Sequence, residues 1–260
     1  NPDSLPGYYG LAEGSWKHFA KAWGVDFEWI KKQFASPAMM GKNGITVSRW
    51  IDGVLENNEL IDQDSNLRGV FYWGHAPNSQ TRGLDMKRAM DKLDLLVVVD
   101  PYPSATAAMA AMPGKAEDLN PNRAVYLLPA ATQFETSGSC TASNRSIQWR
   151  EKVIEPLWES RSDHMIMHQL AEKLGFAKEL SKNYKMQKVG GMDEPMPEDI
   201  LREINKCVWT IGYTGQSPER LKAHMKNMNV FDVKTLKAKG GKDKETGYDF
   251  TGDYFGLPWP

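Results

Sequence analysis

Three short apolar runs in this chain each lead directly into a loop that is rich in polar side chains, glycine and proline. The runs cover residues 69–73, 95–99 and 124–128. Unbroken apolar runs of this length are typical of strands that are buried on both faces, as in parallel sheets. Because open parallel sheets bind ligands at the carboxyl ends of their strands, we expect the three loops to contact a ligand.

The segment between the first two runs has the spacing of a crossover helix. Residues 83–93 carry Leu84, Met86 and Met90 at helical intervals. A strand, a helix and a second strand joined by short connections form a right-handed βαβ unit. The sequence therefore predicts an α/β fold, with a Rossmann-like parallel sheet and flanking helices, followed by a helical and irregular C-terminal part.

Helical spacing of apolar residues also marks several segments outside the sheet. The expected helices cover residues 15–34, 47–60, 162–174 and 197–209, and a further helix begins at a Ser217–Pro218 cap. A lysine- and glycine-rich stretch is expected to form a solvent-exposed loop over residues 234–253. We predict three regions, namely an irregular and helical lead-in, a Rossmann-like ligand-binding domain and a helical extension, over residues 1–66, 67–180 and 181–260.

Composition argues against several classes of partner and site. The 32 basic and 33 acidic residues nearly cancel, so no overall field attracts nucleic acid or a membrane surface. No apolar stretch approaches the roughly 20 residues that a membrane-spanning helix needs. The two cysteines, Cys140 and Cys207, form neither a CxxC pair nor a disulfide framework. His164 and His168 lack the glutamate of an HExxH motif, so we interpret them as one face of a helix.

The ends and the apolar composition predict that this chain is part of a larger polypeptide. It begins Asn1-Pro2-Asp3 without a methionine and stops in an aromatic, proline-rich stretch. Nine tryptophans and thirteen methionines in 260 residues indicate large apolar surfaces that pack against neighbouring segments.

Asp100 is the most informative single residue in the three loops. A carboxylate at the end of a strand can accept two hydrogen bonds from a guanine edge or from a ribose diol, and such charge-assisted bonds are among the stronger polar contacts. An aspartate before Pro101 is also a common turn former or helix cap. The residues alone leave both roles open.

The loop after the first run offers several ways to hold a polar ligand. Gly74 allows a close approach of the backbone and Pro77 rigidifies the loop. Hydrogen-bonding groups come from His75, Asn78 and Ser79. A GxGxxG fingerprint is absent, so this is not a standard dinucleotide loop.

Further polar residues follow the second and third runs. Ser104 and Thr106 could bind a phosphate near the start of a helix, or could simply cap that helix. Arg145 could pair with a phosphate through two hydrogen bonds, or could belong to a loop whose polar groups satisfy its own backbone. No Ser–His–Asp, Cys–His or paired-carboxylate arrangement can be recognised. The residues therefore predict a domain for a nucleotide-type ligand, without a catalytic constellation.

The same loops, in the same order, resemble those of the molybdopterin oxidoreductases, and most closely the large subunit of formate dehydrogenase. Residues 72–79 resemble the family's G-x-N-P-x-x-S loop, with Ala76 where asparagine is usual. Residues 99–107 resemble its D-x-x-x-T-E-T-A element, with serine and alanine in place of the first threonine and the glutamate. Residues 128–149 resemble its L-P…E…G-(S/T)…R-x-x-Q-W run, which here ends in Gln148-Trp149.

This resemblance implies a cofactor and a set of residues that hold it. Family members bind two molybdopterin guanine dinucleotides around molybdenum or tungsten. The sheet of this chain would cradle the guanosine and diphosphate of one of them, with Asp100 as the guanine or ribose partner. The cofactor-binding residues that the resemblance implies are Gly74, His75, Pro77, Asn78, Ser79, Asp100, Pro101, Ser104, Thr106, Gly138, Ser139 and Arg145.

The resemblance also implies what this chain does not contain. The catalytic residues, the metal-bound selenocysteine or cysteine and the cysteines that hold a [4Fe-4S] cluster would belong to segments outside it. The expected function is then a section of the catalytic subunit of a formate dehydrogenase, an oxidoreductase that takes formate to carbon dioxide and passes two electrons to iron–sulfur clusters. The alternatives are a sister reductase acting on nitrate, thiosulfate or a similar oxyanion, and a non-catalytic nucleotide-binding or assembly module.

Partners and compartment follow from the same resemblance. The expected partners are the remaining segments of the catalytic subunit, an iron–sulfur electron-transfer subunit and formate, with a cytochrome subunit as a further candidate and without nucleic acid. The Gln148-Trp149 ending and the Leu5-Pro6-Gly7-Tyr8 segment favour membrane-linked or periplasmic formate dehydrogenases. We therefore expect a periplasmic protein that an upstream signal exports, with the cytoplasm as the alternative.

Overall fold

The computed structural model divides the chain into two compact units, which are described separately. One comprises Gly44–Thr132 and Pro156–Ser162 and is called the sheet unit below. The other comprises Asn1–Asn43, Gln133–Glu155 and Asp163–Pro260 and is called the helical unit. The structure describes residues 13–34, 36–41, 45, 49–56, 65–75, 82–103, 106, 108, 120–142, 146–207, 217–255 and 257–258.

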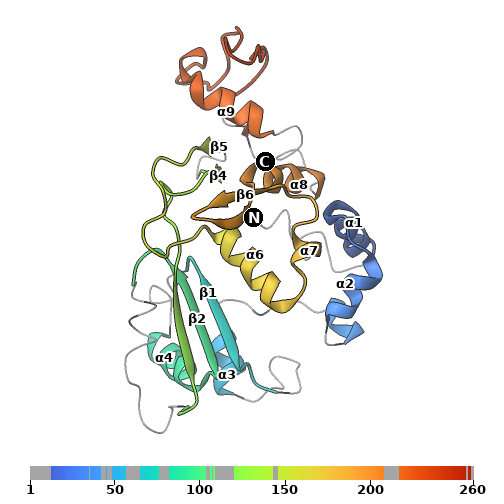
Figure 1. The fold of residues 1–260 in the computed structure, drawn as a ribbon, viewed down its shortest axis with the longest axis vertical. Helices are drawn as coiled ribbons and strands as arrows, with labels where there is room; N and C mark the ends of the chain where they lie inside the picture. Colours follow the sequence, from blue (N-terminus) through green and yellow to red (C-terminus); the bar gives the residue numbers. More distant parts are fainter. Residues whose placement is uncertain are drawn as a thin grey trace. The chain divides into compact units, whose positions relative to one another are not determined.

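The sheet unit is built on three parallel strands, as the apolar runs predicted. The strands are β1 (Gly69–Trp73), β2 (Leu95–Asp100) and β3 (Ala124–Pro129), in the order β1-β2-β3. Helix α4 (Gly83–Lys92) lies between β1 and β2 in the sequence, and α3 (Trp50–Leu55) precedes β1 (Figure 1). This arrangement confirms the α/β class and the crossover helix, whose predicted bounds agree with α4 to within one residue.

Helices α3 and α4 cover one face of this sheet. Tyr72, Leu96 and Val98, which alternate along their strands and so share a face, are almost fully buried. They form one core with the two helices, and its helical members are Trp50, Ile51, Val54, Met86, Ala89 and Met90. Burial of this apolar surface is the main force that holds the unit together.

The prediction that all three strands are buried on both faces is correct only for β2. Residues Leu96 to Val99 of β2 are buried, whereas Tyr126 in β3 is 55% exposed and Phe71 in β1 is 47% exposed. Phe71, Val97 and Tyr126 are register partners, so they share the face opposite to the one that contains Tyr72. The difference arises because only the central strand has a neighbour on each side within the described sheet.

A buried carboxylate ties α4 to the start of β3. Asp91 is 1% exposed, and it pairs with Lys87 one turn earlier on α4. Arg123 Nη1 lies 2.6 Å from Asp91 Oδ1, and β3 begins at the next residue. Two partly buried cations therefore compensate one buried anion, which a carboxylate at this depth requires.

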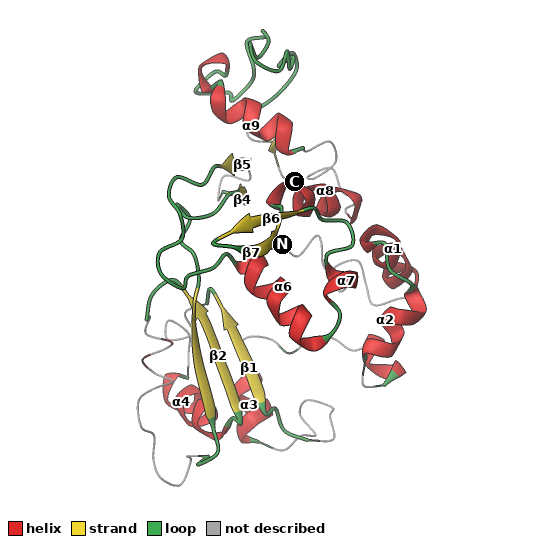
Figure 2. Cartoon of the chain, viewed as in Figure 1, coloured by secondary structure: helices red, strands yellow, loops and turns green. Residues whose placement is uncertain are grey.

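The helical unit contains most of the helices and two small antiparallel sheets (Figure 2). Its helices are α1 (Glu13–Trp23), α2 (Phe27–Gln33), α6 (Asp163–Leu174), α7 (Ala177–Leu180), α8 (Pro197–Cys207) and α9 (Pro218–Lys226), with 3-10 turns at Pro37–Gly41 and Met228–Val230. Its strands are β4 (Gly138–Thr141), β5 (Ser146–Arg150), β6 (Met186–Val189), β7 (Met192–Pro195) and β8 (Leu257–Pro258). In the described residues, no helix is long and apolar enough to span a membrane.

The predicted first helix is wrong in one respect, because residues 15–34 form two helices rather than one. The break lies at Gly24, which adopts a φ of +72° that a helix cannot continue through. Asp26 then begins α2, where its side chain accepts a hydrogen bond from Glu28 N at 2.9 Å. The apolar spacing continues across the break, so periodicity alone does not reveal it.

The other predicted helices are confirmed, with shorter bounds. The structure describes Trp50–Leu55 as α3, while parts of the predicted 47–60 segment fall outside the described residues. Helix α8 ends at Cys207, and residues 208–209 also fall outside the described part. Ser217 caps α9 as expected, since its Oγ accepts a hydrogen bond from Arg220 N at 3.1 Å.

The prediction that residues 234–253 form a solvent loop is correct for most of the segment but wrong for three buried residues, Asp243, Phe250 and Asp253. The segment has no helix or long strand, but it carries part of the core of the helical unit. Phe250 is fully buried and packs with Ala223 and Phe231. Asp253 is also buried, and it accepts hydrogen bonds from the side chains of three residues, Arg220, His224 and Tyr248. Aromatic residues within the lysine-rich sequence therefore decide its packing.

Candidate functional site

The carboxyl ends of the three parallel strands lie side by side, as the predicted site requires. Trp73 in β1 is the register partner of Val99 in β2, and Val99 is the partner of Leu128 in β3. Beyond the strand ends, Gly74 N donates a hydrogen bond to Val99 O at 3.0 Å, and Ala130 N donates one to Asp100 O at 3.1 Å. The structure therefore brings Gly74, Asp100 and Ala130 together at one edge of the sheet, which is called the strand-tip site below.

Asp100 is the last residue of the central strand, and its carboxylate is engaged on one side only. Its Oδ1 accepts a hydrogen bond from Tyr102 N at 3.0 Å, which makes Asp100 the turn former that the sequence left as one option. Among the described residues no hydrogen bond reaches its second oxygen, Oδ2. A carboxylate oxygen can accept further hydrogen bonds, so the turn and a ligand contact are compatible.

A hydrogen bond between described residues joins the loops after β1 and β2. Thr106 is fully buried, and its Oγ1 donates to the backbone carbonyl of His75 at 3.1 Å. The ring of His75 stacks on that of Tyr72, with centroids 6.1 Å apart. The Thr106 hydroxyl thus fixes one loop against the other, while direct contact of Thr106 with a phosphate stays a prediction.

Gly74 begins the turn that follows β1. Its φ is +57°, a conformation that residues with a side chain rarely adopt. A Cβ added at this position would meet nothing within 4 Å, so the space beside the backbone is open. Both properties suit a loop that a ligand approaches closely, and they agree with the role that the sequence suggested for Gly74.

Several predicted site residues cannot be placed. Pro77, Asn78, Ser79, Ser104 and Arg145 lie outside the described residues, and their contacts stay predictions. Pro101 is described, and it is exposed directly after Asp100.

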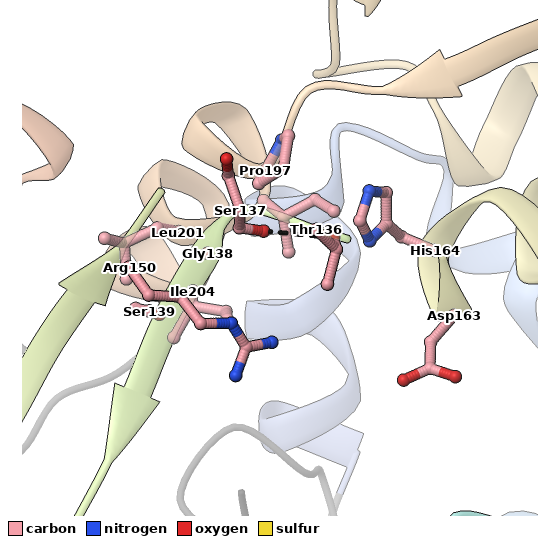
Figure 3. Close-up of a pocket in the computed structure, with 11 residues that line it drawn as sticks. Thr136, Ser137, Gly138, Ser139, Arg150, Asp163, His164, Pro197, Leu201 and Ile204 are labelled. Atoms are coloured by element: carbon pink, nitrogen blue, oxygen red, sulfur yellow. Dashed lines mark hydrogen bonds between the residues drawn. The ribbon is translucent and has the colours of Figure 1, made fainter. Parts of the chain in front are cut away.

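The remaining predicted residues, Gly138 and Ser139, line a cavity of about 230 Å³ in the helical unit (Figure 3). They lie on β4, and β5 runs antiparallel beside it with Arg150 opposite Gly138. The rest of the lining comes from the loop before β4 and the first turns of α6 and α8, namely Thr136, Ser137, Asp163, His164, Pro197, Ile200, Leu201 and Ile204. Sequence reasoning missed Arg150 and His164, because nothing local marks them as neighbours of Gly138.

The cavity combines polar and apolar walls. Arg150 Nε is buried without a hydrogen-bond partner in the described residues. His164 Nε2 lies 3.1 Å from Glu194 Oε1. Ser137 Oγ accepts a hydrogen bond from Lys152 N at 2.8 Å, which fixes that hydroxyl at the rim. Leu201 is buried and forms part of an apolar wall on α8.

A His–Asp pair also exists in this unit, but it lacks access to a ligand. His224 Nε2 lies 2.7 Å from Asp253 Oδ2, and His224 is only 1% exposed. Burial lowers the pKa of His224, although the hydrogen bond to Asp253 partly offsets this effect. Tyr248 and Arg220 share the same carboxylate. The pair therefore holds the 234–253 segment against α9.

The cysteines offer little chemistry in the described structure. Burial raises the pKa of Cys207 to about 12, so this thiol is protonated and unreactive near neutral pH. Cys140 is exposed on β4. No cluster of three or more His, Cys, Asp or Glu side chains that could hold a metal occurs within the described ranges.

Comparison with known proteins gives a consistent result. An F420-dependent formate dehydrogenase subunit alpha of Methanocaldococcus jannaschii is 28% identical over 222 residues, which is 85% of this chain and 26% of the relative. Formate dehydrogenase H of Escherichia coli is 25% identical over 67% of this chain and 20% of its own length. A trimethylamine-N-oxide reductase of Vibrio cholerae is 27% identical over 58% of this chain and 17% of its length. The chain thus spans about a quarter or less of the length of these relatives.

A match to a family model covers a longer part of the chain than the short loop motifs described above. The model for molybdopterin oxidoreductases matches residues 7–173, which include all three parallel strands and their loops. The match extends over more than half of the chain. The ordered loops, the parallel sheet and this match agree, and the chain belongs to the molybdopterin oxidoreductase family.

Proposed function

We propose that this chain is a section of the catalytic subunit of a formate dehydrogenase, and that its sheet unit holds the guanosine end of a molybdopterin guanine dinucleotide. The observation that carries this proposal is the position of Asp100, at the end of the central strand between two other strand tips. The family supports a molybdopterin cofactor, and several relatives that bear the name formate dehydrogenase support the substrate.

The hydrogen-bonding groups of this site fit the guanosine end of such a dinucleotide. Guanine presents adjacent N–H donors, and a ribose presents two hydroxyls, so either needs an acceptor rather than a second donor. Asp100 Oδ2 is such an acceptor, with no other hydrogen bond among the described residues. Gly74 leaves open space beside the backbone at the same edge. An acidic side chain and an open glycine turn therefore lie where this part of the dinucleotide would be held.

The residues of this chain would contribute binding and orientation. When bound, the cofactor supplies the redox chemistry, in which formate loses two electrons and a proton and leaves as carbon dioxide. Asp100 would accept hydrogen bonds from the guanosine and fix its position in the sheet unit. Thr106 would hold the two loops in register through His75 O, without touching the ligand. We further propose an iron–sulfur subunit as the electron acceptor and export to the periplasm.

The similarity to a trimethylamine-N-oxide reductase favours one second candidate, a sister reductase. Such an enzyme would use the same dinucleotide, but it would reduce an oxygen-containing acceptor such as an oxyanion or an N-oxide. The strand-tip residues would bind the dinucleotide in either enzyme. Only the reaction that the complete subunit catalyses distinguishes the two candidates.

The test uses the complete subunit, purified with its cofactor. We expect formate to reduce a viologen dye, and molybdenum or tungsten and guanosine monophosphate to be released on acid hydrolysis. Oxidation of reduced dye by nitrate, thiosulfate or trimethylamine N-oxide, without reduction by formate, would instead identify the sister reductase. Absence of metal and of guanosine monophosphate from an otherwise folded subunit would overturn both candidates and support a non-catalytic module.

A further inference from the structure

The cavity of the helical unit carries an inference that does not depend on the strand-tip site. It is lined by the β4–β5 hairpin, the loop before β4, the start of α6 and one side of α8, and it is open to solvent (Figure 3). All of its lining residues belong to the helical unit, and none of them is a strand-tip residue. Gly138 and Ser139 are the lining residues that the resemblance assigned to the dinucleotide, and the remaining lining residues, Arg150 among them, have no assigned ligand.

Arg150 is the cationic side chain among the residues that line the cavity. Its register partner on β4 is Gly138, which has no side chain and leaves room beside the guanidinium. A Cβ at Gly138 would meet nothing within 4 Å. Arg150 Nε is buried without a hydrogen-bond partner, and Arg150 makes no ion pair with any described residue. A partly buried guanidinium with an unused donor is costly, so an anion that accepts from it would be stabilising.

The polar groups opposite Arg150 are suited to orienting such an anion. In Figure 3 the His164 ring lies beside Thr136, and the Arg150 guanidinium lies below Thr136 and Ser137. Arg150 is the one arginine or lysine among the described lining residues, and an acidic side chain, Asp163, also lines the cavity. A single guanidinium can compensate one negative charge on a ligand, so the lining favours a monoanion.

The fourth side of the cavity is apolar. Pro197, Ile200, Leu201 and Ile204 come from a single helix, α8, where residues three and four apart share a face. The volume of about 230 Å³ corresponds to roughly seven or eight water molecules at about 30 Å³ each. A ligand that fills it would therefore be a small molecule of a few heavy atoms, with an apolar part against α8.

We propose that this cavity binds a small monocarboxylate with a short aliphatic chain. The carboxylate lies against the Arg150 guanidinium, whose planar fork matches its two oxygens. The aliphatic chain lies against Ile200, Leu201 and Ile204. Inorganic oxyanions lack the apolar part that the α8 side chains would contact.

The test measures binding of acetate, butyrate and inorganic phosphate to the complete cofactor-loaded subunit by isothermal titration calorimetry. We expect butyrate to bind about 15-fold more tightly than acetate, because it buries two more methylene groups and each contributes about 0.8 kcal/mol, which is about fourfold in affinity. Phosphate binding as tight as that of butyrate, equal binding of the two carboxylates, or no binding at all would each overturn the proposal. These measurements need no variant.

Two variants locate the site. Arg150→Gln removes the charge and the fork, and we expect it to weaken butyrate at least about 10-fold, as loss of a charge-assisted hydrogen bond does. The matched control is Arg202→Gln on α8, which removes the same charge from a residue that does not line the cavity and pairs with Asp199 and Glu219. Equal effects of the two variants would overturn the proposal. Cofactor content, measured in parallel, reports separately on the strand-tip site.

Discussion

Thr106 donates a hydrogen bond from its buried hydroxyl to the backbone carbonyl of His75, at 3.1 Å. The two residues are 31 positions apart, and each follows a different strand of the parallel sheet. Among the described residues, this contact joins the loop after β1 to the loop after β2. The shape of the strand-tip edge therefore depends on a residue that a ligand does not need to touch.

Replacing Thr106 by valine tests this relationship. Valine has nearly the same shape but lacks the hydroxyl, so the His75 carbonyl loses its hydrogen bond, at a cost of about 1–3 kcal/mol. We expect faster amide hydrogen exchange near Gly74 and lower retention of the dinucleotide in the complete subunit. Thr106→Ser keeps the hydroxyl and serves as the control. Unchanged exchange in Thr106→Val would show that the loops are held together by other contacts.

Asp100→Asn separates the two roles of Asp100. The amide oxygen of asparagine can still accept from Tyr102 N and keep the turn, but its NH2 group replaces the second acceptor. We expect retention of the dinucleotide to fall about 10-fold or more, as for loss of a charge-assisted hydrogen bond. The measurement is guanosine monophosphate released per subunit after gel filtration.

The control for Asp100 lies at the opposite end of the same strand. Asp94 directly precedes β2, and it pairs with Arg68 at 2.5 Å. Asp94→Asn makes the same chemical change away from the strand tips, so it should leave the dinucleotide content unchanged. Full retention by Asp100→Asn would refute the assigned role, even if turnover fell.

The strands and the predicted edge follow from the sequence because their cause is local. Five or six consecutive apolar residues, such as Leu95 to Val99, are typical of a strand that is buried on both faces of a sheet, and a helical crossover of a dozen or more residues allows the next strand to run parallel. The loops that follow must then meet at one edge. Asp100 could be named from the sequence on this basis, and so could its turn.

Features that depend on contacts distant in the sequence could not be predicted in this way. Phe250 lies in a lysine-rich segment, and only its packing against Ala223 and Phe231 makes it part of a core. Arg150 becomes a cavity residue because α8, some 50 residues later, supplies the opposite wall. In both cases the cause is a contact between distant segments. Gly24 differs, because it ends α1 through its local backbone conformation while the apolar spacing around it continues.

Loss of the buried carboxylate at Asp91 should destabilise the sheet unit strongly. Asp91→Ala leaves Lys87 and Arg123 partly buried without their shared anion, which typically costs about 3–5 kcal/mol. The effect should appear as faster amide exchange in α4 and β3. The control is Asp193→Ala, which removes the partner of Lys188 from an exposed pair and should cost less than about 1 kcal/mol. Similar effects of the two variants would contradict the structural role of Asp91.

The buried pair of His224 and Asp253 predicts how stability depends on pH. Burial lowers the pKa of His224 below its ordinary value of 6.5, so the unfolded chain binds a proton there more readily than the folded chain does. Stability therefore falls as the pH drops below about 6.5, until the imidazole is also protonated in the folded state. For Asp253, burial raises the pKa, but hydrogen bonds from His224, Tyr248 and Arg220 outweigh this effect and leave it below 3.8. Its contribution is lost only in stronger acid.

His224→Gln removes the titrating group but keeps a side chain that can donate to Asp253. Between pH 7 and pH 5 we expect amide exchange in α9 and residues 228–255 to accelerate in the wild-type protein and to change much less in the variant. Exchange in α3 and α4 of the sheet unit provides the internal control, since none of the five histidines lies on those helices. If the variant showed the same acceleration as the wild type, protonation of another group would govern this part of the molecule. The reason for expecting a difference is that Asp253 is the common acceptor of all three partners, so charging one of them changes the contacts of the whole segment.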